Sequence, residues 1–203
     1  MKIFKGLIIT ILINISIIGI SQAQTEEAQV ADTTEVSDAE DISRIRQLWN
    51  TIKSDAAETW NNPTHYSLFV PVNTWHNRWT YDDEKIDEYN EMPWGLGLGM
   101  TRHEDKWNLH TLYFMAFKDS NYHVQTIFGY AYQRNWYIGD SDWHYGAGYT
   151  LSLTQREEYE YIPLPLPVPL VGFGYKNLSA QMAYVPGTKN MGNVAFTWIR
   201  ADF

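Results

Sequence analysis

The sequence predicts an all-β fold, an eight-stranded antiparallel transmembrane β-barrel preceded by an N-terminal amphipathic helix. Three observations support this prediction. Glycines alternate with bulky apolar residues over 94–100 (WGLGLGM), so one face of an extended strand is bulky and the other nearly bare. Segments 111–117 and 127–132 are apolar on both faces. Aromatic residues make up 15% of the chain, with 9 Trp and 14 Tyr, as in the interfacial girdles of membrane barrels.

Residues 1–23 are predicted to be a secretory signal peptide. Lys2 and Lys5 form a basic start, residues 6–20 are apolar, and Ser21-Gln22-Ala23 is a small-x-small cleavage site. The alternative is a retained anchor, although the apolar run is short for a membrane span. Loss of two lysines changes the formal net charge from −9 to −11, which disfavours nucleic acid as a partner. The chain contains no cysteine, which excludes disulfides and thiolate metal sites.

Residues 24–40 are acidic and poor in bulky apolar groups, and we predict a flexible leader there. From Asp41, apolar residues recur at helical spacing and predict an amphipathic helix over residues 41–61, which ends before Pro63. Two placements of this helix remain open: at a membrane interface, or packed against its own domain. The apolar stripe consists of Ile42, Ile45, Leu48, Trp49, Ile52, Ala56 and Trp60.

Residues 64–203 are predicted to form the barrel. Runs of apolar and aromatic residues separated by turn signals define eight strands. The connections alternate between long and short, which is typical of outer-membrane barrels, and the last strand ends in an aromatic residue, Phe203. The expected strands are His65–Arg78, Trp94–His103, Leu109–Ser120, Val124–Trp136, Trp143–Gln155, Leu166–Tyr175, Leu178–Val185 and Asn193–Phe203.

Inward-facing glycines predict a hollow inside this barrel. Eight strands enclose a space that side chains just fill, so Gly95, Gly97 and Gly99 are expected to empty one wall, and Gly146 and Gly148 another. A water-filled pore would need more polar inward residues. The predicted content is therefore a hydrocarbon chain, with strand coiling or close packing at the glycines as the alternative.

Prolines predict two breaks in the barrel wall. Pro163, Pro165, Pro167 and Pro169 alternate with apolar residues, with Pro186 on the next strand. Proline donates no hydrogen bond to a ladder, so this run is expected to leave a gap through which a lipid tail passes sideways. Pro71 and Pro93 predict a similar gap between the first two strands. The alternative for the proline run is a rigid extended loop.

Three polar residues are expected at one rim. The six histidines make no HExxH or comparable metal motif, and there is no GxSxG elbow. His76 ends the first strand, and Asp119 and Ser120 end the third, so all three belong at the same end of the barrel. These residue types suit general-base acyl transfer, although spacing alone favours ordinary polar loop residues.

Several segments together resemble the lipid A palmitoyltransferase family (PagP). The resemblance runs in order from about Ala57 to Phe203. The segments that carry it are PVNTWHNR (71–78), YNEMPWG (89–95), AFKDS (116–120), YIPLP (161–165), YVPGT (184–188) and GN (192–193).

This resemblance implies an integral enzyme of the Gram-negative outer membrane that transfers an acyl chain, usually palmitoyl, from a glycerophospholipid to lipid A. The family's essential polar residues match His76, Asp119 and Ser120. We expect His76 to be the general base, Asp119 to orient or stabilise it, and Ser120 to polarise the donor ester. The family's lateral openings match Pro71 and Pro93 on one side and Pro169 and Pro186 on the other. The resemblance implies no metal or cofactor, and we expect a monomer.

One position departs from the family pattern. Its acyl-chain ruler is a glycine at the pocket floor, and the match here is Ala131, on the same strand face as Gly129. An added methyl predicts a pocket about one methylene shorter, and hence a chain slightly shorter than palmitoyl, or a branched one.

Two other classes of protein remain as alternatives. One is a non-catalytic lipid-binding barrel of the outer membrane, against which the presence of all three polar residues argues. The other is a secreted lipocalin-like carrier, which is also an eight-stranded barrel but has polar outward faces.

Overall fold

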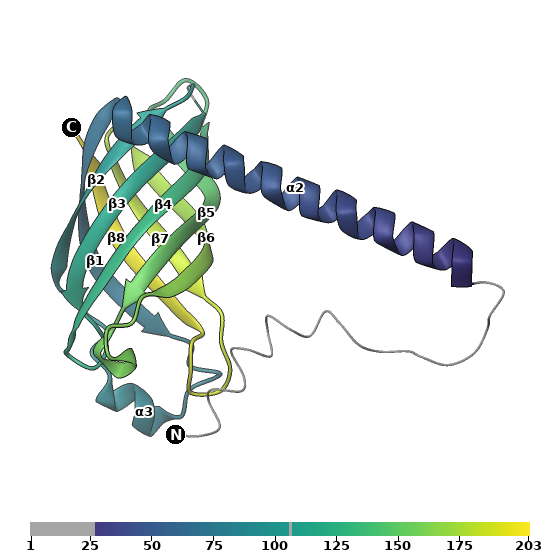
Figure 1. The fold of residues 1–203 in the computed structure, drawn as a ribbon. Helices are drawn as coiled ribbons and strands as arrows, with labels where there is room; N and C mark the ends of the chain where they lie inside the picture. Colours follow the sequence, from purple (N-terminus) through teal and green to yellow (C-terminus); the bar gives the residue numbers. More distant parts are fainter. Residues whose placement is uncertain (1–26, 106) are drawn as a thin grey trace. The chain divides into compact units, whose positions relative to one another are not determined.

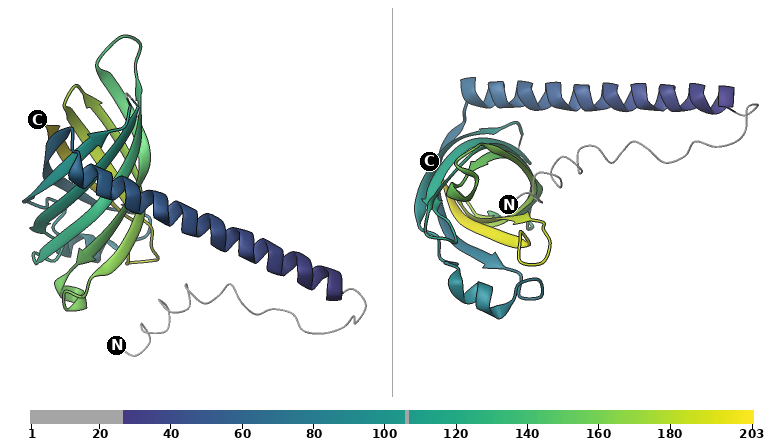
Figure 2. Two further views of the ribbon diagram at one scale, coloured as in Figure 1. Left: turned by 45° about the horizontal axis from the view of Figure 1, so that its top comes forward. Right: turned by 60° about the horizontal axis from the view of Figure 1, so that its bottom comes forward.

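Eight antiparallel strands close into a barrel in sequence order, with β8 pairing back to β1 (Figure 1). The computed structural model describes residues 27–105 and 107–203. The right-hand view of Figure 2 looks into the ring of strands from one end. The predicted fold class is confirmed. The predicted signal peptide and residues 24–26 of the predicted leader lie outside the described residues.

The strands lie close to their predicted positions because apolar alternation and turn residues mark them. The largest shifts are two residues: β1 and β3 each end two residues earlier than predicted, and β6 begins two residues earlier, at Leu164, and so includes more of the proline run. Residues 83–88 form a short helix, α3, that the sequence pattern did not predict. The strands are β1 (His65–His76), β2 (Gly95–His103), β3 (Asn108–Lys118), β4 (Val124–Tyr137), β5 (Trp143–Gln155), β6 (Leu164–Tyr175), β7 (Leu178–Val185) and β8 (Val194–Asp202), with α3 (Asp83–Glu88) after β1 and a 3₁₀ turn, η1 (Glu157–Tyr159), after β5.

The N-terminal helix, α2 (Glu27–Asn61), begins earlier than the predicted start at Asp41. The acidic segment before Asp41 contains neither Pro nor Gly, so nothing in its composition interrupts a helix. In the last turns, Asp55 pairs with Arg102 of β2 at 3.1 Å, and Thr59 is fully buried. Residues 50–61 therefore pack against the barrel. Among the described residues, no helix is both long and apolar enough to cross a bilayer.

The outward face of the barrel is apolar and aromatic. Side chains on opposite faces of each strand alternate in exposure, as the strand period requires. A soluble carrier would place polar groups on this face, so the observed surface favours a lipid environment. Exposed large residues include Tyr66, Leu96, Leu98, Phe114, Phe128, Leu153, Val171, Phe173 and Leu178.

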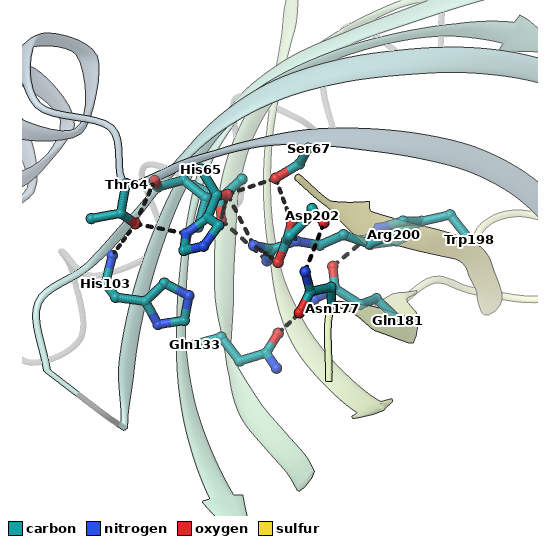
Figure 3. A network of polar contacts seen from close by, with 12 residues as sticks. Thr64, His65, Ser67, His103, Gln133, Asn177, Gln181, Trp198, Arg200 and Asp202 are labelled. Atoms are coloured by element: carbon teal, nitrogen blue, oxygen red, sulfur yellow. Dashed lines mark hydrogen bonds and ion pairs between the residues drawn. The ribbon is translucent and has the colours of Figure 1, made fainter. Parts of the chain in front are cut away.

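Only part of the barrel interior is apolar, whereas the sequence predicted an interior with few polar side chains. Toward the end that holds His65, His103 and the C-terminus, buried polar side chains line and cross the barrel (Figure 3). The Arg200 guanidinium donates to both Asp202 carboxylate oxygens, at 2.8 and 2.9 Å. Ser67 Oγ also donates to Asp202, at 2.7 Å. These groups satisfy one another and form a polar plug across the barrel. A second, polar cavity of about 360 Å³ lies on the side of the plug that faces His65 and His103.

The wall has two gaps where the prolines predict them. The β1–β2 ladder ends at the pair Phe69–Gly97 although β1 continues to His76. The β6–β7 ladder begins at Leu170–Ala183, so the earlier residues of β6 pair only with β5. Both predicted breaks are confirmed, and both lie toward the end of the barrel that carries α3 and η1.

The alternating glycines of β2 do not leave an empty wall. A Cβ at Gly97 would meet Met115 Cγ at 2.3 Å, and one at Gly99 would meet the Phe69 ring at 2.7 Å. Large side chains from neighbouring strands therefore occupy the space that the glycines provide. The expected hollow along Gly95, Gly97 and Gly99 is wrong at these positions, and close packing is the correct interpretation.

Candidate active site

The predicted polar residues meet at one rim, here called the α3 rim, where α3, η1 and the loops after β1, β3, β5 and β7 lie (Figure 1). His76 is the last residue of β1, and Asp119 and Ser120 directly follow β3. His76 Nε2 lies 3.2 Å from Ser120 Oγ. All three side chains are buried. The prediction that they share a rim is confirmed.

His76 is held on its other side by Glu91, from the loop between α3 and β2. Glu91 Oε1 lies 3.0 Å from His76 Nδ1 and also accepts from the His76 backbone N–H at 2.9 Å. Tyr89 stacks on the imidazole with ring centroids 4.6 Å apart, and Tyr81 meets it edge-on at 5.1 Å. The imidazole is therefore fixed in both position and orientation.

Glu91 is ionised. Its carboxylate accepts hydrogen bonds from both terminal nitrogens of Arg78. The Arg78 guanidinium is the main reason that the pKa of Glu91 falls from 4.5 to about 2, and the two contacts to His76 act in the same direction. An ionised carboxylate only accepts, so His76 Nδ1 carries the proton and Nε2 is free to accept one.

Asp119 does not contact His76 in the way that we expected. One carboxylate oxygen accepts the backbone N–H groups of Asn121 and His123, at 2.8 and 3.0 Å. The other lies 3.4 Å from an Arg156 nitrogen. Asp119 therefore shapes the loop that carries Ser120 and holds Arg156, while the carboxylate in contact with the His76 imidazole is that of Glu91.

Below these groups lies a cavity of about 370 Å³. His76, Asp119, Ser120 and Arg156 line its mouth. Pro186 and Pro165 also line it, which places the β6–β7 gap beside the cavity, whereas Pro71, Pro93 and Pro169 are not among the lining residues. The apolar walls consist of Met115, Phe117, Ile127, Leu164, Leu166, Val168, Ala183, Val185, Phe196 and Trp198.

The floor is formed by Tyr113, Met115 and Trp198, not by Ala131. These three residues line the large cavity and also a void of about 10 Å³ beneath it, to which Ala131 belongs. The Tyr113 hydroxyl lies 2.6 Å from Thr150 Oγ1. A Cβ at Gly129 would come within 2.8 Å of that hydroxyl. Ala131 thus lies one layer below the floor and supports it.

Sequence reasoning missed two functional candidates, Glu91 and Arg156. Glu91 stands inside the family-like segment YNEMPWG, but an irregular loop gives no periodicity from which to infer its direction. Arg156 follows β5 immediately, and its Nε has no hydrogen-bond partner within the described part of the chain. Arg156 directly follows a strand, as Asp119 does, and this position in the sequence could have predicted that it lies at the α3 rim.

Residues 27–105 and 107–203 contain no group of three or more His, Cys, Asp or Glu side chains arranged to hold a metal ion. The groups at the α3 rim are thus a base, a hydroxyl and a carboxylate–guanidinium pair beside a cavity of hydrocarbon character. This combination suits transfer of an acyl group between oxygens.

Comparison with known proteins agrees with this chemistry. Residues 55–200 match the family described as antimicrobial peptide resistance and lipid A acylation protein PagP. The chain belongs to the PagP family. A protein called lipid A acyltransferase PagP from Yersinia pseudotuberculosis serotype IB (strain PB1/+) is 55% identical over 157 residues, which are 77% of each chain.

More distant PagP relatives cover more of the chain. The lipid A acyltransferase PagP of Enterobacter lignolyticus (strain SCF1) is 46% identical over 177 residues, 87% of this chain and 88% of its own. That of Erwinia tasmaniensis is 46% identical over 160 residues, 78% of this chain and 85% of its own. The family match includes the last turns of α2 and His76, Asp119 and Ser120. As a member of the PagP family, this chain is an acyltransferase.

Proposed function

We propose that this chain is an integral outer-membrane enzyme that moves an acyl chain, palmitoyl or slightly shorter, from a glycerophospholipid to a hydroxyl of lipid A. The observation that carries the proposal is the position of His76 and Ser120 at the mouth of an apolar cavity, beside a gap in the wall. The relatives' name, lipid A acyltransferase, supports lipid A as acceptor. The exposed apolar surface of the strands supports a membrane location.

The donor's acyl chain lies in the cavity, with its ester at the α3 rim. The chain passes through the β6–β7 gap, which Pro169 and Pro186 flank, and the acceptor approaches past the β1–β2 gap beside Pro71 and Pro93. Because these gaps open to the side, neither lipid has to leave the bilayer. The polar plug around Arg200 separates the acyl cavity from the far end of the barrel.

His76 acts as the general base. Nε2 takes the proton of the acceptor hydroxyl while its oxygen bonds to the ester carbonyl carbon. The bond from that carbon to the glycerol oxygen then breaks, and the glycerol oxygen takes the proton from the imidazolium. A lysophospholipid leaves, and the acyl chain stays on the acceptor. The Ser120 hydroxyl donates to the ester carbonyl, and Asp119 keeps Ser120 and Arg156 in place.

Lipid A mass spectrometry tests this proposal in cells. Outer membranes that contain the wild-type chain are expected to carry lipid A with one additional acyl group, which His76→Ala and Ser120→Ala lose. His123→Ala is the matched control, because the His123 side chain is exposed and pairs with Glu157 rather than entering the cavity. Unmodified lipid A with folded wild-type protein would instead indicate a non-catalytic lipid-binding barrel.

A further inference from the structure

Glu91 is bound to β1 through its backbone as well as through its carboxylate. Its backbone carbonyl accepts the Thr74 N–H at 2.9 Å and the Asn73 side-chain amide at 3.1 Å. Both donors lie on the part of β1 that has lost its ladder to β2. Glu91 is therefore attached to the strand that carries His76, and its carboxylate keeps a fixed position relative to the imidazole.

Among residues 27–105 and 107–203, Glu91 supplies the carboxylate that contacts the His76 imidazole. Both oxygens of Asp119 are engaged by backbone N–H groups and by Arg156. Glu158 lines the cavity but lies 3.5 Å from Arg156. Glu91, by contrast, accepts from His76 Nδ1 while Ser120 Oγ meets Nε2. The order carboxylate, imidazole, hydroxyl is thus made by Glu91, His76 and Ser120.

We propose that Glu91 is the positioning residue for His76, holding the proton on Nδ1 and keeping Nε2 free for the acceptor's proton. This inference rests on the proposed function. Glu91 does not line the cavity that holds the donor's acyl chain, so it acts on the reaction through His76. When Nε2 receives the proton, the imidazolium forms beside an anion at 3.0 Å, which stabilises the positive charge as it develops.

The test compares Glu91→Gln and Glu91→Asp with Glu88→Gln in the full-length protein in detergent micelles. Glu88 is a suitable control because it is exposed and contacts only Lys85 among the ion pairs of the described residues. Glu91→Gln is expected to lower kcat roughly 100-fold or more and to leave KM within about twofold, because lipid binding is unchanged. Glu91→Asp retains the charge and is expected to lose no more than about tenfold.

¹⁵N NMR of the histidine ring gives a readout that a merely structural role would not move. The wild type is expected to show a single Nδ1–H tautomer for His76, which Glu91→Gln loses because an amide can both donate and accept. A folded Glu91→Gln variant with wild-type kcat would overturn the inference. So would a variant that loses thermal stability and activity while His76 keeps the Nδ1–H tautomer.

Failure of the proposed function gives a different result. If the wild type transfers no acyl group to lipid A, the function is wrong whatever Glu91 does. If the wild type is active, His76→Ala is inactive and Glu91→Gln equals the wild type, the function stands and the positioning role fails.

Discussion

Ala131→Gly is expected to deepen the acyl cavity by about one methylene. Ala131 lines the small void beneath Tyr113 and Trp198, which form the floor of the cavity. Loss of the methyl group enlarges a void of about 10 Å³ and lets the Tyr113 ring settle lower. One buried methylene is worth about 0.8 kcal/mol, which corresponds to roughly a fourfold change in preference between donors.

Donor competition measures this change. Purified protein receives an equimolar series of saturated phospholipid donors that differ by one methylene, and the transferred chains are quantified by mass spectrometry. The optimum of Ala131→Gly is expected to move toward the longer chain. Ala147→Gly is the matched control, because Ala147 is exposed on the outer face of β5. An unchanged profile in folded Ala131→Gly, or the same shift in the control, would refute support of the floor by Ala131.

Three further predictions concern the rim and the plug. Arg200→Met leaves the partly exposed Asp202 carboxylate without its guanidinium partner, although Ser67 Oγ still donates to it. The change is expected to destabilise the barrel by about 1–3 kcal/mol, measured by denaturant unfolding against exposed Lys176→Met; equal stability would contradict the plug. Asp119→Asn removes the charge that faces Arg156 and is expected to lower kcat roughly tenfold with the fold intact; unchanged kcat would show that the charge is dispensable. The pKa of Glu91 is lowered to about 2, so its contribution to loop stability is complete above pH 4.5 and is lost as pH falls toward 2. Proteolysis of the loop should therefore be unchanged between pH 7 and pH 5, and a transition in that interval would contradict the ion pair with Arg78.

The sequence predicts the barrel well because its strands depend on local patterns. Alternation of apolar residues and the turn residues between them predicted all eight strands. The prolines predicted both gaps, because a proline lacks the N–H that would bond to the neighbouring strand at that position. The rim could be predicted for His76 and Ser120 because they lie at the ends of β1 and β3, and strand direction determines which end of the barrel each strand reaches.

Other features depend on contacts that a linear pattern does not contain. Ser67 donates to Asp202 across 135 positions, so the polar plug follows from barrel closure and not from any segment. Gly97 on its own predicts a hollow, but the Met115 side chain of β3 occupies that space. Glu91 lies in an irregular loop, where no period indicates which way a side chain points.

Transfer from an isotopically labelled donor tests the central claim most directly. The purified wild-type chain is mixed with lipid A and a phospholipid that carries a deuterated palmitoyl group. The account predicts labelled lipid A and lysophospholipid in equal amounts, with neither product from His76→Ala. Lysophospholipid together with free labelled fatty acid, and no labelled lipid A, would contradict it.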